Sequence, residues 1–508
     1  MSEAVRQPVP NGIVSSAKGV EFRTWLALIG IILAVMASGI GENVSKVALA
    51  DIEGAMSLNL DDGSWIICCY IIGFVLGSGF TPCFWPTFSL RRVALFMAGL
   101  YILCGVLTPY ISQSYSSLLI VRSVQGLTGG AMPPMLMTIV LRFMPPLLKV
   151  PVLGAYALVS AWSATLGATI AALSFSWGWQ GYFYWNIPVM LLAMFLLGYG
   201  LPQDPMKLER LQHFDWKGLI TGTVALGMLS MGLYQGERWD WFNSPLISFL
   251  LLGGLGLLVI FLVNEWSQPI PFFNLQLLKK LNLSFSLIAL GCVLVLMVAL
   301  ISLTSGYLAA VQGYRQEQIS DVMLWVALPQ LIVLPIMSYV CNLQRVDCRI
   351  VLIIGLSLMA LASYMASQLT SDWSAENFRL IQLIQAAAQP MMIIPLLMLA
   401  TIGLQPTDGP FAAAWFNAVK GFAATVAVGV TAFMLRIRGD FHHSQLVNQQ
   451  PTTGLEFAEQ SAGLMKALSA QVKVLATADV FIALMVFIAL LVALTCVMPG
   501  RVYPPTPN

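Results

Sequence analysis

The stretch SFSLIALGCVLVLMVALISLTSGYLAAV, residues 284–311, decides the fold class, because it carries no charged side chain over a length sufficient to cross a membrane. A helix needs about 20 consecutive apolar residues to span the hydrocarbon core of a bilayer. The other structure that satisfies its backbone hydrogen bonds in lipid is a closed barrel, whose strands alternate apolar and polar residues. This stretch shows no such alternation and similar runs recur along the chain, so we expect an all-α polytopic membrane protein.

The composition of the whole chain agrees with a membrane protein and excludes several other classes. Of the 508 residues, 58% are hydrophobic and 9% are charged, whereas a soluble domain has about 25% charged residues. The formal net charge of +2 provides no basic surface for a nucleic acid, so no nucleic-acid partner is expected. The chain has 3 His residues, none of them in an apolar run, which argues against an integral-membrane enzyme, a metal site and any other cofactor.

Fourteen apolar runs are long enough to be membrane-spanning helices. They lie at 24–49, 64–86, 93–110, 116–141, 150–173, 183–201, 216–234, 246–264, 284–311, 320–341, 350–368, 379–403, 411–435 and 476–498. Two longer linkers, 202–215 and 265–283, set two of these runs apart and predict a 6 + 2 + 6 arrangement. With the N-terminus in the cytoplasm, Lys and Arg are about twice as frequent in inner as in outer segments, so both termini are predicted to be cytoplasmic.

This arrangement divides the chain into predicted regions. They are a cytoplasmic tail at 1–23, an N-terminal six-helix bundle at 24–201, two linker helices with flanking cytoplasmic loops at 202–283, a C-terminal six-helix bundle at 284–498 and a cytoplasmic tail at 499–508. One loop, 436–475 on the outer side, is long, and apolar residues at helical spacing in its second half predict an amphipathic helix outside the membrane or lying on it. We interpret this loop either as a contact surface or as a solvated excursion.

Six sequence motifs, in order along the chain, carry a family resemblance. They are LLIVRSVQGLTGGAMPPM (118–135), WGWQGYFYWNIPV (177–189), FDWKG (214–218), ERWDW (237–241), PFFNLQLLKKLN (271–282), and FNAVKGFAATVAVGV (416–430) with the following RGDFHHSQL (438–446). With fourteen predicted spans, the chain resembles the major facilitator superfamily, and within it the fourteen-span drug:proton antiporters of the EmrB/QacA type. The resemblance implies the major facilitator fold and a set of packing and conformational residues: Gly126, Gly129, Gly130, Gly167, Asn186, Pro188, Arg91 and Arg92.

The resemblance also implies a function. Such a protein is a secondary active transporter of the inner (plasma) membrane that exports amphipathic organic compounds or drugs in exchange for protons, by alternating access. Its partners are the lipid bilayer, the small-molecule substrate and protons, and the EmrB type works with a periplasmic adaptor protein and an outer-membrane channel. The loop 436–475 is then the expected periplasmic contact for the adaptor.

Departures from the family pattern leave a second function open. The Asp usual in the first span of the family corresponds here to Gly41, with Glu42 beside it. The fifth-span antiporter motif is reduced to SATLGATIAAL at 163–173. These changes favour an alternative, a narrow-specificity major facilitator that exports a siderophore or another anionic metabolite.

Ionisable side chains inside a span are rare because each costs roughly 2.5–3.5 kcal/mol to insert, so each one is a candidate working part. Glu42 and Lys46 are four residues apart on one helix face, in the favourable order for an ion pair. Together with Arg122 in the fourth-span motif, they are the candidates for proton coupling or charge relay. The alternatives are a self-neutralising pair for Glu42 and Lys46, and a structural hydrogen-bond centre for Arg122.

The candidates for substrate binding are polar or aromatic residues inside spans: Gln125, Tyr70, Tyr156, Trp162, Trp415, Asn417 and Lys420. Aromatic faces bind flat apolar or cationic compounds, although an aromatic residue in a span also serves ordinary helix packing. Lys420 stands where the family usually has Arg, and a Lys amine can titrate whereas a guanidinium cannot. With Lys46 and Arg122, it would suit an anion.

Overall fold

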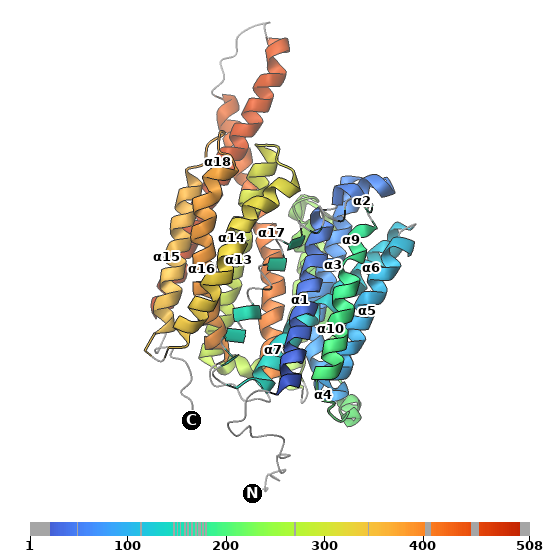
Figure 1. Cartoon of the computed structure of the whole chain (residues 1–508). Helices are drawn as coiled ribbons and strands as arrows, with labels where there is room; N and C mark the ends of the chain where they lie inside the picture. Colours follow the sequence, from blue (N-terminus) through green and yellow to red (C-terminus); the bar gives the residue numbers. More distant parts are fainter. Residues whose placement is uncertain are drawn as a thin grey trace.

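A computed structural model describes residues 21–497, except 48, 112–113, 146–147, 150, 153, 269–270, 344, 402–407, 449–456 and many positions between 157 and 179. Throughout the described part the regular structure is helical, which confirms the predicted all-α fold class (Figure 1). The two predicted tails fall almost entirely outside the described residues, so their placement in the cytoplasm stays a prediction.

The helices follow one another in three groups along the chain. The first group is α1 (Phe22–Val47), α2 (Leu49–Met56), α3 (Leu60–Phe80), η1 (Thr81–Phe84), α4 (Trp85–Phe88), α5 (Leu90–Ile111), α6 (Tyr115–Gly130), α7 (Met132–Phe143), α9 (Gly181–Tyr184) and α10 (Asn186–Gly200). The second is η3 (Leu208–His213), α11 (Trp216–Gln235), η4 (Trp241–Asn243), α12 (Pro245–Ser267) and η5 (Leu275–Lys279). The third is α13 (Leu281–Ala310), α14 (Gln316–Cys341), α15 (Cys348–Ser367), α16 (Ala375–Thr401), α17 (Gly409–Asn448) and α18 (Phe457–Val497).

Twelve helical segments in the described part are long and apolar enough to cross a membrane. The predicted span 216–234 does form a helix, α11, but its glycines and polar residues make it less apolar than these twelve. The predicted span 150–173 falls on residues that are described only in part. A multi-pass helical membrane protein is therefore established, while the total of fourteen spans remains a prediction.

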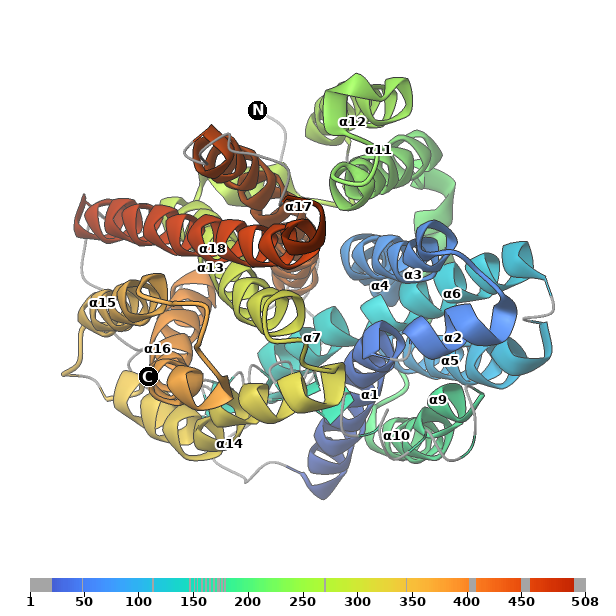
Figure 2. The same cartoon turned by 90° about the horizontal axis from the view of Figure 1, so that it is seen from above.

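Packing between the helices separates the first group from the third. In the first group α1 packs against α10, α3 against α6, and α5 against both α6 and α10. In the third, α16 packs against α14 and α15, and α13 against α17. The pair α11 and α12 lies beside α3 and α17, at the edge of the seam between the groups (Figure 2). We refer to the two groups as the N-terminal and C-terminal helices, and their predicted domain boundaries stay a prediction.

Glycines bring α3 and α6 into backbone contact. A Cβ added at Gly126 would meet the carbonyl oxygen of Tyr70, and one added at Gly130 would meet that of Phe74. In return, a Cβ at Gly73 of α3 would meet the carbonyl oxygen of Ser123. Small residues four apart allow this close approach of helices in a membrane, and it fixes the position of everything that α6 carries.

The loop between α11 and α12 joins α3 to α17 at the predicted outer end. Arg238 Nη2 lies 2.5 Å from Asp61 Oδ1 at the start of α3. Arg436 on α17 pairs with Glu237, its Nε 3.4 Å from Oε1, and also with Asp240. Hydrogen bonds from Asn243 and Arg436 lower the pKa of the Asp240 carboxyl. The ion pairs therefore connect the N-terminal and C-terminal helices through the loop between α11 and α12.

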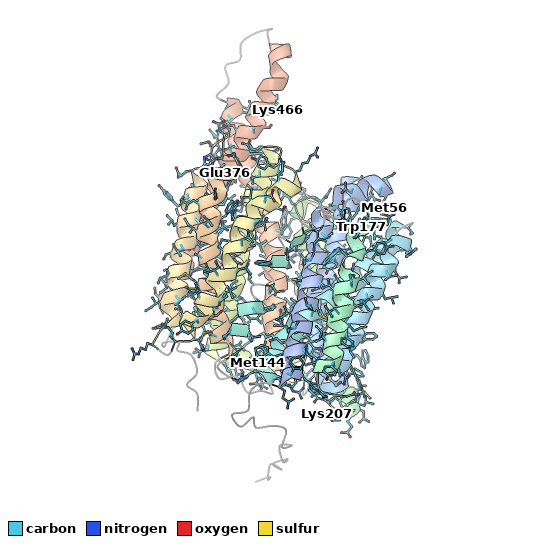
Figure 3. All side chains as sticks on the ribbon, viewed as in Figure 1. Met56, Met144, Trp177, Lys207, Glu376 and Lys466 are labelled. Atoms are coloured by element: carbon cyan, nitrogen blue, oxygen red, sulfur yellow. The ribbon has the colours of Figure 1, made fainter. Side chains whose placement is uncertain are left out.

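The predicted outer segment 436–475 contains the helix expected in its second half, and its first half is largely helical as well. α17 continues to Asn448 and α18 begins at Phe457, so most of the segment belongs to two helices that rise above the rest of the molecule (Figure 1). Lys466 lies on this hairpin, well beyond Glu376 at the predicted outer end of α16 (Figure 3). The helical first half was not predicted, because a hydropathy window ends where charged residues begin, whereas charged residues do not end a helix.

Candidate functional site

Arg122 is the centre of a buried cluster among the N-terminal helices. It lies on α6 and its side chain is 1% exposed. Its Nη1 donates a hydrogen bond to Gln125 Oε1 at 2.6 Å. The guanidinium carbon lies 4.4 Å from the ring centroid of Tyr70 on α3 and 5.5 Å from that of Phe183 on α9. Aromatic faces attract a cation most strongly where water is excluded, so this cluster stabilises a permanent charge inside the membrane.

Hydrogen bonds from α3, α5 and α10 complete the cluster. The Tyr70 hydroxyl donates to the carbonyl oxygen of Ser38 on α1 at 2.9 Å. The Tyr101 hydroxyl on α5 donates to the carbonyl oxygen of Ala37 at 3.4 Å, and accepts from Asn186 Nδ2 at 3.3 Å. The motif residue Asn186 thus meets the Arg122 region through Tyr101. Sequence reasoning missed Tyr101 and Phe183, since nothing in their spacing distinguishes them from packing aromatics.

Gly41 makes room for this arrangement. A Cβ at position 41 would collide with the Tyr101 hydroxyl. The resemblance expects an Asp here, so the tyrosine hydroxyl occupies space close to where that carboxylate would begin. The neighbouring carboxylate, Glu42, pairs with Lys46 at 2.6 Å, with side chains 23% and 39% exposed respectively. Glu42 also lies within electrostatic range of Arg122 and Tyr70, so the three candidates for charge relay lie in one region.

A second cluster joins the two groups of helices. The Tyr156 hydroxyl donates to Asn417 Oδ1 on α17 at 2.9 Å, and Lys420 Nζ donates to the same hydroxyl at 3.3 Å. Lys420 Nζ also lies 5.0 Å from the centroid of the Tyr156 ring. From α3, Ser78 Oγ donates to the carbonyl oxygen of Asn417 at 3.5 Å. Three of the predicted binding residues therefore meet where the N-terminal and C-terminal helices touch.

The two candidate tryptophans bridge separate elements. Trp162 Nε1 donates to the carbonyl oxygen of Ala327 on α14 at 2.9 Å. Trp415 Nε1 donates to the carbonyl oxygen of Asn274 at 3.3 Å, and its ring packs edge-on against Phe273 at 5.0 Å. The structure therefore divides the predicted binding residues: Gln125 and Tyr70 lie around Arg122, and the tryptophans lie at contacts between distant segments.

The remaining motif residues lie at helix contacts and helix starts. A Cβ at Gly129 would lie 2.9 Å from the Tyr70 hydroxyl, and one at Gly167 would lie 2.6 Å from Asn43 Cβ on α1. Pro188 is exposed in the first turn of α10, where a missing N–H costs no helical hydrogen bond. Arg91 and Arg92 lie in the first turn of α5, at the predicted inner end.

A buried set of amides in the C-terminal helices was not predicted as a site. We call it the glutamine cluster, and it consists of Gln330 on α14 with Gln382, Gln385 and Gln389 on α16. All four side chains are at most 3% exposed, and Gln330 Nε2 donates to Gln389 Oε1 at 2.6 Å. The positions 382, 385 and 389 have the spacing of one helix face. That pattern was the available signal, but in the sequence the glutamines served only to weaken the predicted span.

The chain is similar to known transporters in sequence and in structure. The sequence profile of the family described as Major Facilitator Superfamily matches residues 31–316. The multidrug export protein EmrB of Haemophilus influenzae is 23% identical over 507 residues, covering 93% of this chain and 96% of that protein. The fatty acid resistance protein FarB of Neisseria gonorrhoeae is 23% identical over 428 residues, covering 83% and 82%. The human organic anion transporter MFSD10 has a like fold, with a TM-score of 0.57 at 12% identity, covering 92% of this chain and 98% of that one.

Proposed function

Because the chain belongs to the major facilitator superfamily and its resemblance to EmrB-type proteins is confirmed, we propose that it exports amphipathic organic compounds or drugs across the inner membrane. The observation that carries the proposal is the buried Arg122 cluster, which maintains a permanent cation among aromatic faces and hydroxyl groups. A charged side chain within the membrane is costly, so a buried arginine there indicates a functional site. The multidrug export function of the EmrB relative supports the same substrate class.

Proton exchange by alternating access is the mechanism we assign to this exporter. Among the described residues, Glu42 is a carboxylate within electrostatic range of Arg122, and it is partly exposed. In its charged form Glu42 interacts with both Lys46 and Arg122, and protonation removes that interaction. Because Glu42 is partly exposed, movement of the two groups of helices changes its surroundings, so loss of its charge changes which arrangement is favoured, and this is the differential interaction that coupling requires.

Transport by purified protein in proteoliposomes tests this mechanism. With an imposed pH gradient, wild-type protein should move ethidium against its concentration gradient, and Glu42→Gln should abolish that pH-driven movement. Glu376→Gln is the matched control, because Glu376 is an exposed carboxylate whose ion pair with Arg379 spans 3.7 Å. Transport by Glu42→Gln equal to wild-type at every pH gradient would remove Glu42 from the mechanism.

A second candidate function is the export of an organic anion by the same fold. Lys420 approaches Tyr156 and Asn417 at the junction of the two groups of helices, and a Lys amine there is suited to a carboxylate. The similarity to FarB supports a fatty acid as the anion. If this function holds, Lys420→Gln should abolish laurate export and Lys420→Arg should retain it. If Lys420→Gln lost ethidium transport but kept laurate export, the export of amphipathic compounds or drugs would be favoured instead.

The hairpin of α17 and α18 is the surface that we propose for a periplasmic adaptor, which would lead to an outer-membrane channel. Ile437, Phe441 and Met465 are exposed apolar residues on its protruding part. Its base is held by Asp479, which pairs with Arg438 and lies 2.5 Å from His442 Nε2. Phe441→Ser combined with Met465→Ser should abolish co-purification with a co-expressed adaptor. Unchanged thermal unfolding of that double variant shows that the loss is not misfolding.

A further inference from the structure

The glutamine cluster holds polar atoms that the described protein does not satisfy. Gln382 Nε2 and Oε1, Gln385 Oε1 and Gln389 Nε2 are buried without a hydrogen-bond partner among the described residues. By contrast, Gln389 Oε1 accepts from Gln330. A buried amide left unpaired is destabilising, more so in a membrane, and native proteins rarely keep one without a reason. Four unpaired atoms within two turns of one helix indicate a missing partner.

The chemistry of these atoms indicates what that partner must offer. Two of the unpaired atoms are amide nitrogens, which donate, and two are carbonyl oxygens, which accept. Pro390 adds a further acceptor, because it has no N–H for the carbonyl oxygen of Ala386 one turn earlier. After Arg379, α16 contains no charged residue. The matching group is therefore neutral and both donates and accepts, as a hydroxyl or an amide does.

The glutamine cluster adjoins the junction between the two groups of helices. Gln330 lies one helical turn along α14 from Ala327, whose carbonyl oxygen accepts the hydrogen bond from Trp162. Because the four glutamine side chains are at most 3% exposed, a compound held between the N-terminal and C-terminal helices meets the cluster after the two groups have moved apart.

We propose that the glutamine cluster is a neutral polar subsite that binds the hydroxyl and amide groups of the exported compound. This inference rests on the proposed export function and deepens it. The cationic Lys420 and the aromatic Tyr156 lie at the junction outside this subsite, so the glutamine cluster contributes the contacts to neutral polar groups. Compounds without hydrogen-bonding groups then bind without using the cluster.

Stability measurements separate a ligand subsite from a structural network. Gln382→Met removes two unpaired polar atoms and retains the size of the side chain, so the unliganded variant should unfold at the same temperature as wild-type or higher. Gln235→Met is the matched control, because Gln235 is equally buried and its Nε2 donates to Ser64 Oγ at 3.1 Å. The control should unfold at a lower temperature. A lower unfolding temperature for Gln382→Met as well would show that its amide is satisfied structurally and would overturn the proposal.

Binding to the purified full-length protein completes the test, with chloramphenicol as the probe that carries hydroxyl and amide groups and tetraphenylphosphonium as the probe without them. Gln382→Met should raise the Kd for chloramphenicol about 3- to 10-fold, the loss of a neutral hydrogen bond or two, and leave that for tetraphenylphosphonium unchanged. Gln385→Met should behave alike, and Gln235→Met should affect neither probe. Equal chloramphenicol binding by all variants would overturn the subsite. Binding of tetraphenylphosphonium but not chloramphenicol by wild-type protein would also overturn it, while leaving drug export intact.

Discussion

Replacement of Gly126 by alanine tests whether the contact between α3 and α6 maintains the Arg122 cluster. An added Cβ would overlap the carbonyl oxygen of Tyr70 and lie 2.9 Å from its carbonyl carbon. Carbon and carbonyl oxygen atoms come no closer than about 3.3 Å, so the helices must separate by roughly 1 Å. Overpacking of this kind destabilises the folded state by about 1–3 kcal/mol. Alanine also reduces the conformational entropy of the unfolded chain, which offsets about 0.4–1 kcal/mol of that cost. A net destabilisation of about 1–2 kcal/mol follows.

Thermal unfolding of the purified protein measures this cost, and Gly256 supplies the matched control. Gly256 is also in the middle of a membrane helix, α12, but an added Cβ there meets no atom within 4 Å. Gly256→Ala should therefore leave the unfolding temperature unchanged or raise it slightly. Gly126→Ala should lower that temperature by a few degrees, at about 2–4 °C per kcal/mol.

Transport provides the second readout for Gly126→Ala. The ring of Tyr70 lies 4.4 Å from the Arg122 guanidinium, so separation of α3 from α6 withdraws the aromatic face that stabilises the charge. Ethidium export by Gly126→Ala should therefore fall further than export by a variant that is equally destabilised by a substitution outside the contact between α3 and α6. The reasoning is refuted if Gly126→Ala matches wild-type protein in both stability and export while Gly256→Ala behaves as expected.

Three further predictions concern single contacts. Arg436→Gln should destabilise the purified protein by at most about 1 kcal/mol, and the effect should shrink in high salt, because its ion pairs are partly exposed. Because the pKa of Asp240 is lowered in the folded protein, its ion pair adds its full stability at pH values above the ordinary carboxyl range and loses it as the pH falls through the folded pKa. Asp240→Asn should therefore destabilise the protein by the same amount at every pH from 8 to 5, as measured by unfolding. Gly41→Ala should lower the unfolding temperature, and less so in a Tyr101→Phe background, with a coupling of about 0.5–3 kcal/mol in a double-mutant cycle.

The sequence predicts the membrane helices well because the bilayer imposes one simple rule, a long apolar run for each crossing. That rule locates α13 and most other spans. Within a span, helical periodicity places Glu42 and Lys46 on one face, where the structure pairs them. The rule of apolar runs fails where a helix leaves the membrane. The charged residues beyond Leu435 end the apolar run, but α17 continues to Asn448 and packs against α18 in the protruding hairpin.

Contacts between distant helices lay beyond the sequence. Tyr101 approaches Gly41 and Asn186 only because α1, α5 and α10 pack around one another, and no spacing along the chain encodes that meeting. The contact of Tyr156 with Lys420 likewise joins residues from opposite groups of helices. The glutamine face of α16 was different, since its helical spacing was visible, but its meaning depended on knowing that those amides are buried.

The polar contacts inside the membrane divide according to what a rigid-body movement would do to them. Hydrogen bonds within one group of helices, such as Arg122 to Gln125 and Gln330 to Gln389, survive a rotation of that group as a whole. Bonds between groups, above all Tyr156 to Asn417, must break or change partners. A ligand shifts such an equilibrium only through contacts that differ between the two arrangements. In the proposed mechanism, the junction at Tyr156 is therefore where substrate binding can be converted into movement, whereas the contacts within the Arg122 and glutamine clusters keep their geometry.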